Sequence, residues 1–195
     1  MKHPAGFFST LRGVLLTPGR VFGRQYTGRA DANALLFAIG VSILVLIAQQ
    51  ALVRVLPSLL DNIVSTSRLA LILPARLEGR EIIVNALLLP VLVSVLLVVH
   101  AAVLHILLWL AQSGERGYAV TLQTLCLCCG CLVLRLIPHT GNYAAIVCWL
   151  LMLALGLRLA HGSPWHRILP VVALHVSTAA WLLAIFEGWV RAPWV

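Results

Sequence analysis

Long uncharged apolar runs are the feature of this sequence that most limits its fold. Crossing the hydrocarbon core of a bilayer as a helix takes about 20 mostly apolar residues. Clusters of Gly, Pro, Ser and Asn separate runs of roughly this length in the chain. The pattern predicts an all-α, polytopic membrane helix bundle with about five transmembrane helices. The expected spans cover residues 32–53, 82–112, 118–137, 143–160 and 167–186 of a single domain, residues 1–195.

Composition excludes an ordinary soluble domain. Hydrophobic residues make up 61% of the chain and charged residues 10%, against about 45–50% and about 25% in soluble domains. A soluble fold of 195 residues could not keep that much apolar surface out of water. The net charge of +8 lies between the apolar runs rather than on one face. We therefore expect lipid headgroups, and no nucleic acid, to meet these charges.

The connections and the basic residues predict how the helices are arranged. The breaks at residues 113–117, 138–142 and 161–166 are too short for anything but antiparallel neighbours. Lys and Arg favour a cytoplasmic N-terminus, because the short positive flank before the first span usually sets orientation. The start of the chain lacks the pattern of a cleaved signal peptide, so the first hydrophobic helix is expected to stay in the membrane. We expect a multi-pass protein of the bacterial inner membrane.

Residues 1–31 form a basic flank before the first span. From Phe7 to Tyr26, helical spacing gathers most apolar residues on one side, with a break near Pro18 and Gly19. This predicts a cytoplasmic amphipathic segment lying along the inner headgroups; a disordered flank is the alternative. Residues 52–73 are interrupted by charges and predict a hairpin or an amphipathic helix rather than another span. The basic residues expected to contact lipid or a partner are Arg12, Arg20 and Arg24.

Four of the five cysteines lie in one six-residue stretch inside the third predicted span. Their directions diverge around a helix, so they cannot converge on one metal ion. Small residues allow membrane helices to approach closely, and packing is the favoured interpretation. On the same ground, Gly130 and Gly156 are expected to contact partner helices. The clustered cysteines are Cys126, Cys128, Cys129 and Cys131, and the fifth is Cys148.

Histidines in the second and fifth spans leave two interpretations open. His105 and His175 lie at similar depth by residue counting, each about two turns from the cytoplasmic end. Two histidines at matched depth on neighbouring helices can ligate a haem. Neutral histidine, including His100, also serves as a hydrogen-bonding residue between membrane helices. Haem ligation by His105 and His175 is therefore an alternative hypothesis, and the main interpretation includes no cofactor and no metal.

Catalytic motifs are missing from the sequence. It contains no H-E-x-x-H, no G-x-S-x-G and no G-x-x-x-x-G-K. Its six acidic residues avoid the centres of the spans, where coupled transporters usually carry a carboxylate. Arg135 lies near the outer end of its span and can snorkel, or can meet a buried partner such as Glu187 or a bound anion. We expect no enzyme, and a transporter would have little polar lining beyond Gln123, Thr124, Ser177 and Thr178.

The order of several short motifs resembles the bacterial branch of the Ypt-interacting (Yip) membrane protein family. The matching motifs are Leu15-Leu16-Thr17-Pro18-Gly19-Arg20-Val21-Phe22 before the first span, Leu136-Ile137-Pro138-His139-Thr140-Gly141-Asn142 after the third, and Gly156-Leu157 with His161-Gly162-Ser163 at the end of the fourth. The family's "TxP" element is shortened here to Thr17-Pro18. The third span often carries Tyr and Pro in relatives, where this chain has Cys126 to Cys131.

The resemblance covers about residues 10–187 and implies five spans with no catalytic residues to carry over. It implies a non-enzymatic membrane protein that acts through partners or lipids. The partners expected are membrane lipids and another integral membrane protein or a second copy of this chain. The two alternatives are a haem-binding electron-transfer subunit and a transporter of small molecules or lipids.

Overall fold

The computed structural model describes residues 6–23, 32–60, 77–138 and 140–191, with side chains described except for 56–60 and 179–191. The described elements are helical throughout. They are α1 (Phe7–Leu16), α2 (Pro18–Phe22), α3 (Ala32–Leu60), α5 (Gly79–Leu110), α6 (Tyr118–Cys128), the 3₁₀-helix η1 (Cys129–Leu136), α7 (Gly141–His161) and α8 (Trp165–Arg191).

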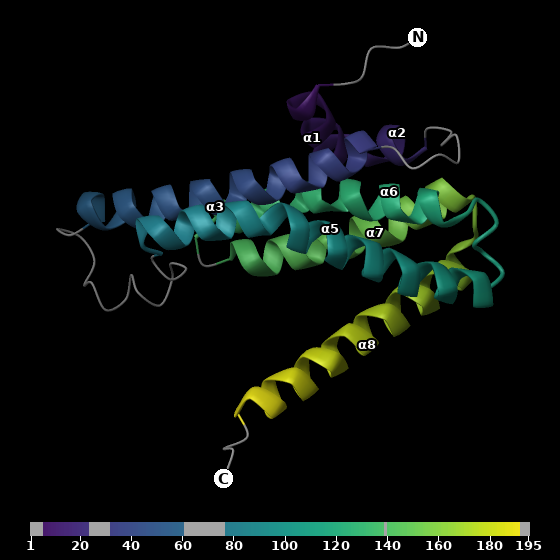
Figure 1. The fold of residues 1–195 in the computed structure, drawn as a ribbon. Coiled ribbons are helices and arrows are strands. Elements are labelled where there is room, and N and C mark those ends of the chain that lie inside the picture. Colours follow the sequence, from purple (N-terminus) through teal and green to yellow (C-terminus); the bar gives the residue numbers. More distant parts are fainter. Residues whose placement is uncertain (1–5, 24–31, 61–76, 139, 192–195) are drawn as a thin grey trace.

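Four spans form one antiparallel bundle, which confirms the predicted all-α membrane fold (Figure 1). Among the described residues, the segments long and apolar enough to cross a membrane are Ala32–Val55, Gly79–Leu110, Tyr118–Leu136 and Gly141–His161. The fifth predicted span lies within α8, whose side chains are described only as far as Thr178. In Figure 1, α8 packs on α5 and α7 near its start and then runs away from the bundle.

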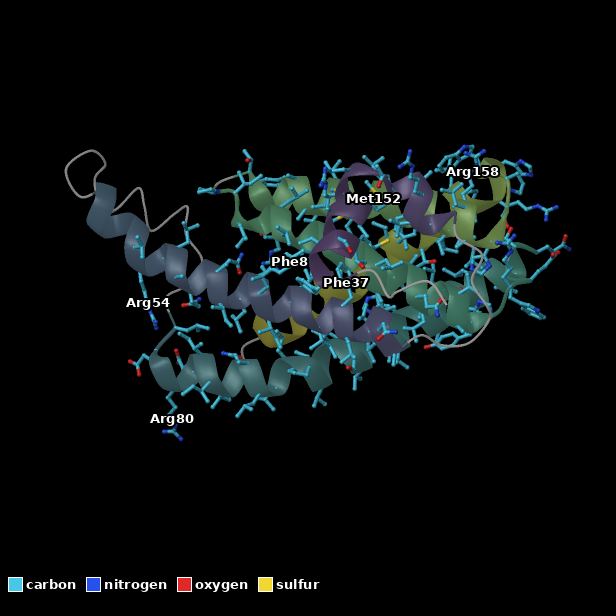
Figure 2. The ribbon with its side chains drawn as sticks, turned by 90° about the horizontal axis from the view of Figure 1, so that it is seen from above. Phe8, Phe37, Arg54, Arg80, Met152 and Arg158 are labelled. Atoms are coloured by element: carbon cyan, nitrogen blue, oxygen red, sulfur yellow. The ribbon has the colours of Figure 1, made fainter. Side chains whose placement is uncertain are left out.

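The bundle has two ends, which we name by a residue at each. The His161 end holds the start of α3, the end of α5 and the α7–α8 turn; the Glu78 end holds the start of α5 and the η1–α7 turn. Figure 2 shows Arg54 and Arg80 at the Glu78 end and Arg158 at the opposite end. Under the predicted orientation, the His161 end faces the cytoplasm.

The third span differs from the expected single α-helix. It is α-helical from Tyr118 to Cys128 and 3₁₀-helical from Cys129 to Leu136. A 3₁₀-helix rises about 2.0 Å per residue against about 1.5 Å in an α-helix. The tighter helix therefore lengthens the span to about 32 Å, close to the about 30 Å of a bilayer's hydrocarbon core.

The predicted break in the N-terminal flank is confirmed at Thr17, which separates α1 from α2. Pro18 begins α2, where its missing N–H costs no hydrogen bond and its fixed φ suits the first helical turn. Residues 24–31 and 61–76 lie outside the described part of the chain. The prediction for Arg24 and most of the prediction for residues 52–73 fall there; α3 itself continues to Leu60.

Candidate functional site

The N-terminal helices are docked on the side of the bundle. Val14 of α1 and Phe22 of α2 are fully buried, and Phe7 packs on Phe37 of α3 with ring centroids 5.4 Å apart. Figures 1 and 2 show that α1 runs across the long axis of the bundle rather than along α3. An amphipathic helix in a membrane surface has this orientation, but here its apolar side is covered by protein.

Two glycines make this docking possible. A Cβ at Gly130 would lie 3.2 Å from Val14 Cγ1, and a Cβ at Gly156 would lie 3.1 Å from Phe22 Cδ1. Both glycines were predicted to contact a partner, and both are buried beneath the chain's own N-terminal helices. The small-residue surface is therefore filled from within, and a partner would have to bind elsewhere.

The docked helices leave a mixed surface facing outward. Phe8 is 75% exposed and Leu16 is 68% exposed. Arg12 and Arg20 are also exposed, as the sequence interpretation requires of residues that contact lipid or a partner. This surface combines apolar anchors with guanidinium groups, which is the composition of helices that bind anionic membranes.

A buried polar cluster joins α5, α6 and α7 at the His161 end. Thr121 Oγ1 lies 3.1 Å from His105 Nδ1 and 3.1 Å from His161 Nε2. A threonine hydroxyl carries one hydrogen, so with two neutral histidines one imidazole donates to Thr121 and the other accepts from it. The three side chains thus fix each other's hydrogen positions and connect three helices.

Two arginines near this cluster donate hydrogen bonds to backbone carbonyls of other segments. Arg116 Nη1 donates to the carbonyl of Ala160 at 2.7 Å, and Arg167 Nη1 donates to the carbonyl of Gln112 at 2.9 Å. Ala160 lies in the last turn of α7, where carbonyls have no partner within the helix and cations satisfy them well. Arg158 stacks 4.6 Å above the ring of Trp165. These contacts fix the α5–α6 and α7–α8 connections to each other.

The structure does not pair the two histidines of the haem hypothesis with each other. The ring of His105 lies 6.4 Å from that of His161, centroid to centroid. The ring of His175 lies 5.6 Å from that of His100, at an interplanar angle of 79°. Residue counting along separate helices gave matched depth but not the direction of each side chain around its helix. The ring contacts therefore give no support to His105 and His175 as two ligands of one haem.

The clustered cysteines contribute to packing in the bundle. Cys126, Cys128, Cys129 and Cys131 are all buried. Cys131 Sγ of η1 lies 3.0 Å from Cys148 Sγ of α7, and both thiols are free. The contact joins the two halves of the hairpin that turns at Gly141. At the Glu78 end of the same hairpin, Arg135 Nε donates to Asn142 Oδ1 at 3.0 Å.

Sequence reasoning missed Thr121 and His161 as partners of His105. The available signal was position: His105 near the end of the second predicted span and His161 directly after the fourth lie toward the same side of the membrane, with Thr121 of the third span between them in the sequence. What the sequence could not supply was the rotation of α5, α6 and α7 about their axes. Packing sets this rotation, and these spans are apolar on all sides, so no amphipathic stripe marks their inward faces.

Removal of the Thr121 hydroxyl is expected to weaken the bundle. Thr121→Val keeps the shape and leaves facing nitrogens of two imidazoles without their shared partner, at a cost of about 1–3 kcal/mol. The loss should be read from unfolding titrations in mixed micelles. Thr121→Ser should restore stability. Thr124→Val is the matched control, because Thr124 Oγ1 donates only to Val120 O of its own helix; an equal loss in both valine variants would contradict the bridging role.

A scan against models of protein families, a search of curated protein sequences and a search of solved structures found no match for this chain.

Proposed function

We propose that this chain is a non-enzymatic, multi-pass membrane protein that acts as an accessory or scaffold subunit, binding another membrane complex, lipid, or both. The proposal includes its membership of the Yip family, its location in the bacterial inner membrane and its cytoplasmic N-terminus. The motif order of the sequence supports the family. The basic flank before α3 supports the orientation.

The observation that carries the proposal is the exposure of α5 at the Glu78 end, from Gly79 to Leu96, which we call the bare half of α5. No side chain from Gly79 to Leu96 is buried, whereas Leu97, Ala101, Leu104 and Leu108 are all buried farther along the helix. The bare half projects apolar side chains that only hydrocarbon or another membrane helix can cover favourably. The most exposed of them are Ile83, Leu87, Leu88, Val91 and Leu92.

Exposure on this scale is uneven within the bundle. Phe37, Ala38, Val41 and Val45 of α3 are buried, and η1 with α6 is buried along most of its length. An edge helix that makes few contacts at one end offers a site where a second membrane protein can add a helix. The family resemblance leads to the same role, since it implies action through partners or lipids.

Affinity purification from native membranes in mild detergent tests the proposal. Retained proteins should be identified by mass spectrometry, and retained lipids by lipid extraction. The double variant Leu87→Ala/Val91→Ala is expected to lose a bound partner, because it removes bulk from the bare half of α5 without adding charge. The matched control is Val147→Ala/Leu151→Ala, since these residues are 56% and 64% exposed on α7.

The outcomes separate the parts of the proposal. A stoichiometric partner lost from the α5 variant and kept by the α7 variant supports an accessory subunit that binds through α5. Retention of lipid alone removes the accessory-subunit role and leaves a protein that acts on the bilayer. A chain that retains neither protein nor lipid contradicts the proposal as a whole.

A further inference from the structure

The level of α1 along the bundle is unusual for a helix that lies parallel to a membrane surface. Leu11 and Val14 of α1 reach Gly130, where an added Cβ would lie 3.5 Å from Leu11 Cδ1. Gly130 is twelve residues beyond Tyr118, the start of the third span, which corresponds to about 18 Å along the helix. This places α1 near the midpoint of that span.

Counts along two other helices place the remaining contacts of the N-terminal segment nearer the His161 end. Phe7 of α1 contacts Gly40, where a Cβ would lie 3.0 Å from Phe7 Cε2. Gly40 is eight residues into α3, or about 12 Å from its start. Phe22 of α2 contacts Gly156, five residues before the end of α7 and about 8 Å from that end. The N-terminal segment therefore descends along the bundle from α2 to α1.

Charged and polar groups on α1 conflict with a bilayer of ordinary thickness at that level. A hydrocarbon core of about 30 Å beginning at the ends of the spans would surround α1 with acyl chains. Arg12 and Ser9 on the outward side of α1 are exposed. An unpaired arginine in hydrocarbon draws in headgroups and water and thins the bilayer locally. The side chain can also snorkel, but α1 lies across the bundle axis and many ångströms from its end.

We propose that α1 and α2 hold anionic phospholipid headgroups beside the bundle, so that the leaflet on the His161 side is locally thinned there. Arg12 and Arg20 bind the phosphates, while Phe8 enters the acyl chains beneath them and Leu16 lies at the level of the headgroups. The thinning is confined to the part of the bilayer beside α1 and α2, because the bare half of α5 still requires hydrocarbon. The inference deepens the proposed function by naming the lipid contact, and it rests on that function only for its biological role.

Spin labels can measure the water level beside α1 directly. In a cysteine-free background, a label at Leu16→Cys reports on α1 in vesicles containing phosphatidylglycerol. Val99→Cys provides the matched control: Val99 is 53% exposed on α5 and eleven residues from the end of that helix, about 17 Å. Oxygen and a water-soluble nickel complex are the two relaxing agents for power saturation.

The expected result is several-fold greater nickel access at position 16 than at position 99, although α1 contacts Gly130 at about the level of Val99. Arg12→Leu should reduce nickel access at position 16, and Arg12→Lys should retain it. Equal, low nickel access at the two positions would overturn the inference. So would high access that is unchanged by Arg12→Leu.

A docking control ensures that the label reports the arrangement in the structure. Val14→Cys with Gly130→Cys should form a disulfide when diamide is added to the vesicles, because Val14 Cγ1 lies 3.2 Å from the Cβ position of residue 130. Each thiol gives up one electron and one proton, and the azo bond of diamide takes up both pairs to become a hydrazine. No cross-link would mean that α1 leaves the bundle in a bilayer, which also overturns the inference. None of these outcomes bears on whether a protein partner is found by purification, so failure of this inference is distinguishable from failure of the proposed function.

Discussion

Replacing Gly141 by alanine is expected to destabilise the protein more than any other change considered. A Cβ at this position would overlap the carbonyl oxygen of Leu134 and would lie 3.1 Å from Arg135 C and Cα. These are backbone atoms of η1, and they cannot rotate away as a flexible side chain can. We expect a loss at or above the upper part of the about 1–3 kcal/mol that overpacking usually costs.

The measurement is the unfolding midpoint in mixed micelles, compared with the wild-type chain. Gly79→Ala provides the control, because a Cβ there meets no atom within 4 Å. The Gly141 variant should also separate η1 from α7. Oxidative cross-linking of Cys131 to Cys148 should then be slower than in the wild-type chain. A Gly141→Ala protein as stable as Gly79→Ala would show that the η1–α7 turn is not as close as described.

Gly156→Leu is expected to release the N-terminal helices. Position 156 faces Thr124 Cγ2 at 2.8 Å and Phe22 Cδ1 at 3.1 Å from the Cβ that would be added. A leucine must displace either α6 or Phe22, and Phe22 belongs to a five-residue helix at the edge of the bundle. The weaker attachment should yield first, with the loss of about 2 kcal/mol of packing.

Limited trypsin digestion checks this expectation, since Arg12 and Arg20 become cleavable once α1 and α2 leave the bundle. Cleavage should accelerate several-fold in Gly156→Leu while the four spans stay protected in the micelle. Gly79→Leu introduces the same side chain into open space and should leave cleavage unchanged. Unchanged cleavage in Gly156→Leu would contradict the docking of Phe22 against α7.

The histidines illustrate how far sequence reasoning reaches. It identified His105, His100 and His175 as the polar residues worth attention in apolar spans, and the structure places each of them in a histidine pair or cluster. The choice of partners was not predictable. A rotation of about 100° per residue separates neighbouring positions on a helix. An error of one position in the inward face of a helix therefore changes every predicted side-chain contact.

The N-terminal segment shows the same boundary between local and global information. Pro18 and the spacing of apolar residues predicted an amphipathic helix with a break near Pro18 and Gly19, because proline geometry and amphipathic periodicity act locally. The same pattern predicted that the apolar side would lie on lipid, along the inner headgroups. The structure decides for protein, since Val14 and Phe22 are fully buried against the bundle. Glycine contacts between distant segments produce that result.

By itself, the sequence determined that this chain forms helices that cross a membrane, and where most of them begin and end. Hydrocarbon leaves few ways to satisfy a backbone, so length and apolarity suffice for that conclusion. Only the tertiary structure decided which faces meet, that Gly130 and Gly156 are covered from within, and that α1 lies midway along the bundle. Those facts depend on close contacts between residues far apart in the chain, and packing of that kind leaves no periodic signal in a uniformly apolar helix.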